Sequence, residues 1–261
     1  MKIVVFGGAG WLGRATMANL EVQSSEIRAH EVRAFDHKPE AWAAWEDVDG
    51  PWEGERIYGD IANYAQVEEA IAGCDAVIHV AVWFPRGGEH DRTDETAFLV
   101  NLKGLWNVLE ASRHAGVRRV VHIGSCQTIH PKGVFFDAEV RRPDASLYAV
   151  TKRLQEEMCR QFWDGFQLPL IVLRPDYIVD TRIGLGRQKE RLGPEGHRAG
   201  AGWVCRHDLA QACRMAAEAG PEIGFDIFHI VGTAEAAQSC NVERSRTVLG
   251  LKYEGDIDPY R

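Results

Sequence analysis

A tyrosine and a lysine four positions apart have the chemistry of a proton acceptor and its activator. Tyr148 and Lys152 have the i, i+4 spacing that places two side chains on one face of a helix. A phenol with its usual pKa of about 10 is a weak base at neutral pH. A neighbouring ammonium favours the phenolate and lowers that pKa. We therefore expect Tyr148 to take the proton of a substrate hydroxyl while hydride leaves the carbon that bears this hydroxyl.

A glycine-rich turn near the start of the chain has the pattern that binds a dinucleotide. Gly7, Gly10 and Gly13 follow an apolar run directly and open a predicted helix. The first glycine permits a sharp turn, the second lets the backbone approach a pyrophosphate, and the third lets the helix pack close to the sheet. Amide groups at the helix start, including those of Trp11 and Leu12, then face the phosphates. The pattern predicts a nicotinamide dinucleotide that accepts the hydride; a tight turn without a ligand is the alternative.

An acidic residue ends the second predicted strand. Asp36 stands where a carboxylate can accept hydrogen bonds from both hydroxyls of the adenosine ribose. The same carboxylate would repel a 2′-phosphate, so NAD is favoured over NADP. His37 and Lys38 lie next to it and weaken this preference.

A second acidic residue follows the third predicted strand. We expect Asp60, together with Ile61, to meet the adenine base of the dinucleotide. The alternative is that Asp60 caps a helix that begins near Tyr64.

Short apolar runs alternate with longer stretches of helical periodicity and must position these residues. Strands are predicted at residues 3–6, 31–35, 56–58, 76–80, 119–123, 170–173 and 225–231. Continuous runs of valine and isoleucine are typical of strands buried on both faces. We therefore predict an α/β fold, a Rossmann-type doubly wound parallel sheet with a small C-terminal substrate-binding part. Ligands bind such sheets beyond the carboxyl ends of the strands, where these motifs lie.

The chain is predicted to form a single NAD-binding domain over residues 1–261. Substrate-binding elements come mainly from about residue 175 to residue 261. From about 180 to 203 the pattern dissolves into Gly, Arg and Lys, which predicts a loop or small insertion. Helices are expected at 207–219 and 241–249.

The segment 97–114 is apolar on nearly every side, as expected for a helix covered on two sides. The sheet would cover one side. Either a second subunit or complete internal burial accounts for the other. We expect a homodimer formed through helices 97–114 and 147–163.

Composition limits the other partners. The net charge of −8 argues against nucleic acid, and no run of 18 apolar residues predicts a membrane span. Because a strand-like run follows Met1 and Lys2 at once, we expect no signal peptide. The six cysteines contain no CxxC pair and indicate reduced thiols in a cytoplasm. The ten histidines show no metal-ligand spacing, so no metal is expected.

Taken together, these motifs resemble the extended short-chain dehydrogenase/reductases, the NAD-dependent epimerase/dehydratase family. The resemblance covers about residues 1–180 well and the rest loosely. Stretches 101–108 and 142–148 are similar to the uronate dehydrogenases, which oxidise a hexuronic acid at C1 to its lactone with NAD. The resemblance implies that Val80, Ala81 and Val82 line the dinucleotide. It also implies that Asn101 supports the active site through water and that Pro175 lies near the nicotinamide.

The resemblance also points to a departure at the fifth strand end. The family's catalytic serine or threonine falls on Cys126, which we expect to face Tyr148, with Ser125 one position early. Either Ser125 or Thr128 supplies the hydroxyl and Cys126 only packs, or the site works with the weak hydrogen bond of a thiol.

A basic stretch beyond the sixth strand is the candidate site for an anion. Arginine can hold a carboxylate or phosphate in a bidentate fork, although a solvated basic loop is the alternative. The residues expected at the substrate are Trp83, Gln127, Thr128, Arg174, Arg187 and Arg191. Trp83 and Phe84 make the site bulkier and more apolar than a sugar acid would suggest.

Three functions fit these observations. The first is an NAD-dependent oxidoreductase acting on a hydroxyl of a sugar acid or related carbohydrate, with a small-molecule substrate that is expected to be anionic. The second is an epimerase or dehydratase that keeps its NAD bound. The third is a non-catalytic NAD-binding regulatory protein, suggested by Cys126.

Overall fold

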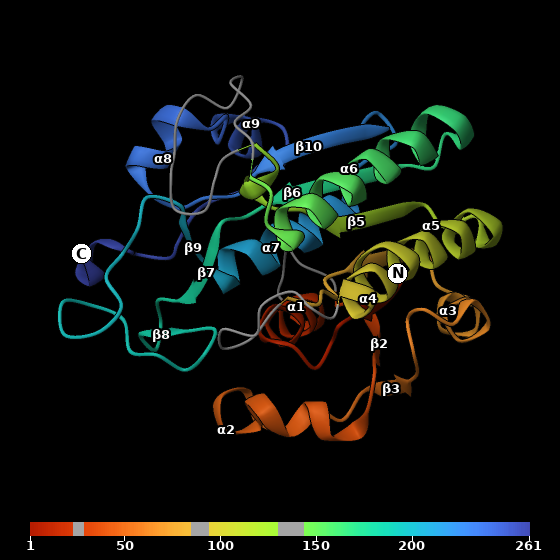
Figure 1. The fold of residues 1–261 in the computed structure, drawn as a ribbon, viewed down its shortest axis with the longest axis horizontal. Helices are drawn as coiled ribbons and strands as arrows, with labels where there is room; N and C mark the ends of the chain where they lie inside the picture. The colour runs from red at the N-terminus through yellow and green to blue at the C-terminus, as the bar shows by residue number, and fades with distance from the viewer. Residues whose placement is uncertain (23–28, 85–93, 130–143) are drawn as a thin grey trace.

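The computed structural model describes residues 1–22, 29–84, 94–129 and 144–261 of the chain. Its centre is a seven-stranded sheet with the order β10-β6-β5-β4-β1-β2-β3, in which every pairing is parallel (Figure 1). The strands are β1 (Lys2–Phe6), β2 (Glu31–Asp36), β3 (Glu55–Tyr58), β4 (Ala76–His79), β5 (Arg119–Ile123), β6 (Leu170–Arg174) and β10 (Phe225–His229). The predicted doubly wound parallel sheet is confirmed.

Alternating side chains of these strands fill two apolar cores, one on each face of the sheet. The helices are α1 (Trp11–Glu21), α2 (Glu46–Asp49), α3 (Tyr64–Ile71), α4 (Asp94–Ala97), α5 (Gly104–Ala115), α6 (Leu147–Phe166), α7 (Arg206–Glu218), α8 (Ala234–Ser239) and α9 (Glu243–Thr247), with 3-10 turns η1 (Pro39–Trp45), η3 (Cys126–Thr128) and η4 (Asp258–Tyr260) and the π-helical turn η2 (Phe98–Lys103). Ile3 and Val5 pack with α1 and α7, whereas Val4 and Phe6 pack with α3, α5 and α6. Burial on both faces explains why the strands read as continuous apolar runs.

A second, small sheet lies at the left of Figure 1, and its strands are β7 (Tyr177–Asp180), β8 (Leu185–Gly186) and β9 (Trp203–Cys205). It encloses the stretch predicted as a loop or insertion. Strand β10 joins the large sheet at its edge beside β6, and α7 packs on α1, so the C-terminal third adds an edge strand and a helix on one face of the large sheet.

One C-terminal prediction is wrong in its boundaries. The helix expected at 241–249 is present but shorter, as α9 (Glu243–Thr247), and the helix α8 that precedes it was not expected. Cys240 between them has an extended backbone, and α8 begins at Thr233, whose side chain accepts a hydrogen bond from the amide of Ala236. A capping threonine of this kind fixes a helix start that apolar periodicity alone does not show.

The apolar segment 97–114 is not completely buried, which excludes one of its two interpretations. Phe98, Leu99 and Trp106 are 40–46% exposed, while Leu105 and Val108 of the same segment are fully buried against the sheet. Among the described residues, no helix combines the length and apolar composition needed to cross a bilayer. Over those same ranges, no group of histidine, cysteine and acidic side chains could hold a metal ion.

Candidate active site

The turn between β1 and α1 leaves no room for side chains at two of its glycines. A Cβ on Gly7, whose φ is +88°, would lie 2.8 Å from the amide nitrogen of Ala81, and a Cβ on Gly13 would lie 2.1 Å from the carbonyl oxygen of Gly7. At Gly10 the single close atom is that oxygen, at 3.3 Å, and the residue is exposed. Gly10 caps α1 without any side-chain partner, so the amide groups that begin α1, those of Trp11 and Leu12 included, have no capping acceptor. Such a cradle fits the pyrophosphate of a dinucleotide.

Asp36 lies at the end of β2 and is tied to that turn. Its Oδ2 accepts a hydrogen bond of 2.9 Å from the amide of Ala9, and its Oδ1 accepts from the amide of His37. The Nδ1 atom of His37 is 2.8 Å from the same Oδ1. The carboxylate is therefore held beside the glycine turn, where a ribose would reach it.

Asp60 does not cap the following helix. The side chain of Asn63 accepts from the amide of Ala65 and caps α3, so the capping interpretation of Asp60 is wrong. Asp60 is exposed, and its Oδ1 accepts from the amide of Ala62 in a local turn. Ile61 is buried beneath α5, where it packs directly against Gly104.

Tyr148 and Lys152 lie in the first turns of α6, which begins at the capping side chain of Ser146. Lys152 is 2% exposed, and its Nζ donates a 2.7 Å hydrogen bond to the carbonyl of Ile123 at the end of β5. Burial lowers the pKa of Lys152 to about 7. The Nζ atom lies 5.9 Å from the centre of the Tyr148 ring.

The phenol of Tyr148 has a hydroxyl as its hydrogen-bond partner and lies within electrostatic reach of a guanidinium. Burial raises the pKa of Tyr148, while a hydrogen bond from Ser125 and the charge of Arg187 lower it in part. The expected lowering of the tyrosine pKa is thus not produced by the protein alone, because desolvation outweighs both neighbours. A positively charged nicotinamide ring bound here would supply the missing charge.

Cys126 does not face Tyr148 as expected. Its thiol donates to the carbonyl of Arg174 at 3.3 Å, and its side chain packs in a small apolar cluster with Cys240 and Val242. Burial and the hydrogen bond with Cys240 raise the pKa of the Cys126 thiol. Ser125 has an extended backbone at the start of η3, so it and its neighbour point in different directions, and the serine is the residue that reaches the phenol.

Thr128 offers no free hydroxyl to the site. It is 3% exposed, and its Oγ1 donates to the carbonyl of Ser125 at 3.0 Å. Of the two hydroxyl groups considered for the tyrosine, that of Ser125 reaches the phenol. The hydroxyl of Thr128 is instead bound to a backbone carbonyl of the η3 turn.

Asn101, fully buried in η2, joins the segment after β4 to α6. Its Oδ1 accepts from the amide of Trp83, and its Nδ2 donates to the carbonyl of Trp83 and to Oγ1 of Thr151. This fixes the segment that contains Val80, Ala81 and Val82 beside Gly7. Pro175 is buried next to η3, where its carbonyl accepts from the amide of Cys126 at 2.9 Å.

Two of the residues expected at the substrate have side-chain partners within the protein, Arg174 and Gln127. The guanidinium of Arg174 forms a bidentate ion pair with Glu156, so its assignment to the substrate is not supported. Gln127 donates to Asp144. Residues 142 and 143 of the similar stretch lie outside the described residues.

Arg187 is the one member of the basic stretch placed at the tyrosine. Its guanidinium lies 4.5 Å from the ring centre of Phe84 and 5.7 Å from that of Tyr177. Within the described part of the chain it has no ion pair, and its buried Nε has no hydrogen-bond partner. Arg191 is exposed, four positions further along the same hairpin.

Two buried groups near the site were not predicted as functional. His79 and His122 are neighbours on β4 and β5, with their Nδ1 atoms 3.0 Å apart. Burial lowers the pKa of His79 to about 3, so the pair is neutral. Arg206 is 3% exposed on its side chain and joins Asp49 to Asp180, with its guanidinium 3.9 Å from the centre of the Trp11 ring. Apolar patterning gave no signal for either, because each depends on partners distant in sequence.

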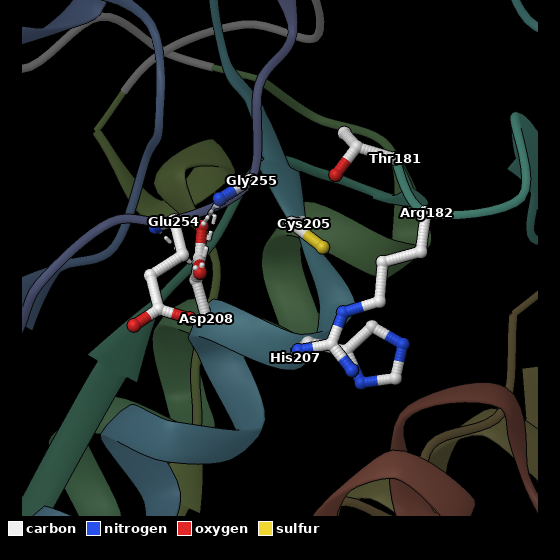
Figure 2. A pocket seen from close by; sticks show the side chains of 7 residues that line it. All are labelled: Thr181, Arg182, Cys205, His207, Asp208, Glu254 and Gly255. Carbon is white, nitrogen blue, oxygen red and sulfur yellow. Dashed lines mark hydrogen bonds between the residues drawn. The ribbon is translucent and has the colours of Figure 1, made fainter.

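A cavity of about 120 Å³ lies beyond this arginine, at the start of α7 (Figure 2). In Figure 2 Arg182 and His207 form one wall and Asp208 and Glu254 the other, with the sulfur of Cys205 between them. Asp208 accepts hydrogen bonds from the amides of Glu254 and Gly255 and so fastens the C-terminal segment to α7. The cavity includes none of the residues at the glycine turn or at Tyr148.

Known proteins are similar to this chain in sequence over part of its length and in fold over its whole length. The uronate dehydrogenase of Pseudomonas putida is 29% identical over 213 residues, which are 80% of this chain and 69% of that protein. A 3-beta-hydroxysteroid dehydrogenase of Mycolicibacterium neoaurum is 35% identical over 127 residues, 48% of this chain but 32% of that protein. The crystal structure of UDP-glucuronic acid 4-epimerase from Bacillus cereus in complex with NAD superimposes with a TM-score of 0.75 at 17% identity, covering 100% of this chain and 96% of that one.

A family model fits most of the chain. The model described as "NAD dependent epimerase/dehydratase family" matches residues 3–182, a range that contains the glycine turn, Asp36, Ser125, Tyr148 and Lys152. The fit of a dinucleotide to the glycine turn agrees with that description. The chain belongs to the NAD dependent epimerase/dehydratase family, and NAD is its cofactor.

Proposed function

We propose that this protein is an NAD-dependent dehydrogenase that oxidises a hydroxyl of a sugar acid, in the manner of a uronate dehydrogenase. The observation that carries the proposal is the position of Arg187, a guanidinium without an acidic partner among the described residues, beside a tyrosine that already contacts a serine. An anionic group on the substrate would complete this site. The similarity to the uronate dehydrogenase of Pseudomonas putida supports the same substrate class.

In this mechanism the protein positions the substrate and moves one proton. Ser125 and the Oη of Tyr148 hold the reacting hydroxyl, and Arg187 holds the carboxylate of the same molecule. When bound, NAD supplies the acceptor for hydride. The phenolate of Tyr148 takes the hydroxyl proton as the carbon–oxygen double bond forms, and the ammonium of Lys152 favours that phenolate. The ring of Phe84 supports the guanidinium of Arg187.

The assignment of Ser125 also bears on the regulatory alternative. That alternative arose because Cys126 stands at the position of the family's catalytic hydroxyl. With Ser125 in contact with the tyrosine and Lys152 behind it, the site keeps the three functional groups that proton transfer requires.

A screen of NAD reduction tests the proposal. Glucuronate, galacturonate, aldoses, polyols and their phosphates would each be supplied with NAD, and NADH followed by absorbance. We expect NADH to accumulate with at least one uronate. No NADH with any of them, while NAD remains bound, would favour an epimerase or dehydratase and overturn the dehydrogenase.

We further propose that the protein is a homodimer. Five large apolar side chains of the segment 97–114 and of α6 are 40–54% exposed, and they are Phe98, Leu99, Trp106, Leu154 and Phe166. The elements η2, α5 and α6 that carry these side chains pack against one another, and large exposed apolar side chains on neighbouring elements support an interface. Light scattering after gel filtration should give twice the chain mass, and Trp106→Glu should give a monomer.

The remaining proposals concern organisation and compartment. We propose that residues 1–261 act as one unit, because β10 and α7 complete the large sheet and its helical layer. All six cysteines are buried thiols, which supports the proposal of a reducing cytoplasm.

A further inference from the structure

The arginine beside the tyrosine is presented by a tight hairpin. The amide of Gly186 donates to the carbonyl of Glu190 at 2.9 Å, and the amide of Lys189 donates to the carbonyl of Gly186 at 3.0 Å. Arg187 and Lys189 are thus two positions apart within one turn. Whatever holds one end of this turn constrains the other.

One side of the hairpin faces the proposed substrate site. The carboxylate of Glu190 accepts from the hydroxyl of Tyr177 and, at 2.7 Å, from the amide of Gln188. Because Glu190 is engaged in this way, the nearest acid in the hairpin is not paired with Arg187. Aromatic faces, those of Tyr177 and Phe84, support the guanidinium instead.

The other side of the hairpin is fastened to the nucleotide-binding half. The Nζ of Lys189 lies 2.7 and 2.8 Å from the two carboxylate oxygens of Asp47 in α2, and 5.2 Å from the ring centre of Trp45. The hydrogen bond from Lys189 lowers the pKa of Asp47. This ion pair joins two segments 142 residues apart in sequence.

The segment that contains Asp47 is itself fixed on the glycine turn. The rings of Trp45 and Trp11 have their centres 4.3 Å apart, and the neighbouring Asp49 forms a bidentate ion pair with the buried Arg206. Asp47 is therefore a firm anchor for the hairpin. Lys189 has a φ of +62°, a conformation that a non-glycine residue adopts when its surroundings hold it.

We propose that Asp47 and Lys189 are a positioning pair, which fixes Arg187 at the substrate by anchoring its hairpin to the segment packed on the glycine turn. The inference rests on the proposed function, in which Arg187 binds the anionic group. Without the pair, the hairpin has to be ordered again each time a substrate binds, and that ordering weakens binding. The pair does not touch the reacting atoms, so the chemical step is unaffected.

Steady-state kinetics with NAD and glucuronate test this role. The side chains of Lys189 and Asp47 are 42% and 62% exposed. For an ion pair exposed to this degree, we expect Asp47→Asn and Lys189→Ala each to raise the KM for glucuronate about threefold, with kcat and the KM for NAD unchanged. Lys189→Arg should keep the wild-type KM, and the exchange of Asp47→Lys with Lys189→Asp should restore most of it. The difference in KM between the wild type and these variants should disappear at about 1 M salt, because salt screens the ion pair in the wild type.

Two further variants separate the ion pair from the backbone and from charge in general. Glycine adopts a positive φ without strain, so Lys189→Gly keeps the backbone conformation and removes only the ion pair with Asp47. It should therefore raise the KM for glucuronate as much as Lys189→Ala does. Glu243→Gln breaks a similarly exposed pair with Arg246 in α9 and should change nothing.

Hydrogen exchange gives a readout that needs no substrate. Amides of residues 185–191 should exchange faster in Asp47→Asn than in the wild type. Unchanged exchange together with unchanged KM would overturn the positioning role. If these variants loosen the hairpin and Arg187→Ala still leaves the KM for glucuronate unaltered, the proposed function fails and the proposed role of the pair fails with it.

Discussion

The two sides of this site are built by different means. On the cofactor side, backbone atoms dictate the residue types: a Cβ at Gly13 would overlap the carbonyl of Gly7, and Asp36 is held by an amide of the same turn. On the substrate side, side chains from segments far apart meet at Tyr148: Ser125, Lys152 and Arg187 come from η3, α6 and the hairpin after β8. A backbone constraint leaves a local mark in the sequence, whereas a meeting of distant side chains does not.

The largest expected effect is at the tyrosine. Tyr148→Phe removes the phenol oxygen and keeps the ring. A positioned proton acceptor contributes roughly 10²–10⁴-fold, so turnover should fall by that factor with the NAD affinity unchanged. Initial rates measure the turnover, and quenching of the protein's tryptophan fluorescence by added NAD measures the NAD affinity. A loss of less than about tenfold would place the chemistry elsewhere.

Arg187 and Arg191 offer a contrast within one hairpin. Charge-assisted hydrogen bonds contribute about 1.5–3 kcal/mol, so Arg187→Ala should raise the KM for glucuronate roughly tenfold to a hundredfold. Arg191 is exposed, and among the described residues its guanidinium has no ion pair, so it should tolerate alanine. Equal effects of the two substitutions would return the stretch to a solvated basic loop.

Adjacent residues at the end of β5 should also differ. Ser125→Ala removes the hydroxyl that contacts the phenol, and a neutral hydrogen bond of about 0.5–1.5 kcal/mol predicts a loss in kcat/KM of up to roughly tenfold. Cys126→Ser should leave activity equal or higher, because the thiol packs away from the tyrosine. A folded Cys126→Ser variant that binds NAD but has lost turnover would give the thiol a specific role.

Asp36 should set the preference of the cofactor site for NAD over NADP. We expect NAD to bind at least about tenfold more tightly than NADP, the factor that corresponds to about 1.4 kcal/mol of repulsion between the carboxylate and a 2′-phosphate. Titration of both cofactors by fluorescence measures the ratio. Equal affinities would mean that His37 or Lys38 neutralises the carboxylate.

The smallest expected effect is a gain in stability. Lys152 has a pKa of about 7 in the folded chain and 10.5 as its ordinary value. The unfolded chain therefore binds more protons than the folded chain between pH 7 and pH 10.5. The destabilisation of the folded state by this buried lysine is complete below pH 7 and fades as the pH rises through that window.

Without NAD, Lys152→Met should raise the Tm by a few degrees, as about 1 kcal/mol does in a chain of this size. The gain at pH 6 should exceed the gain at pH 9.5. A gain independent of pH, measured by thermal scanning, would rule out the charge as its source.

The contrast between the two sides also explains what the sequence could predict. Strand boundaries are confirmed to within two residues in most cases, because valine and isoleucine runs such as 119–123 are buried on both faces. Asp36 was identified because it directly follows such a run. The predicted orientation of Cys126 is wrong. The extended backbone at Ser125 decides which of the two neighbouring side chains turns toward α6, and the residue types alone do not reveal this backbone conformation.

Long-range partners account for the other differences. Arg174 lies in a family motif, but its engagement by Glu156 depends on how α6 crosses β6. The buried link from Arg206 to Asp49 spans 157 residues. Local periodicity shows neither the partner of a charged side chain nor its distance, so the sequence alone assigns Arg174 to the substrate and gives no role to Arg206.

The most direct test of the central claim is the stoichiometry of NADH formed from glucuronate. With the wild-type protein and excess NAD, one NADH should form for each glucuronate consumed, and the Tyr148→Phe variant should form almost none over the same time. Consumption of a uronate without NADH, or equal NADH from both proteins, would contradict a dehydrogenase that uses Tyr148 as its proton acceptor.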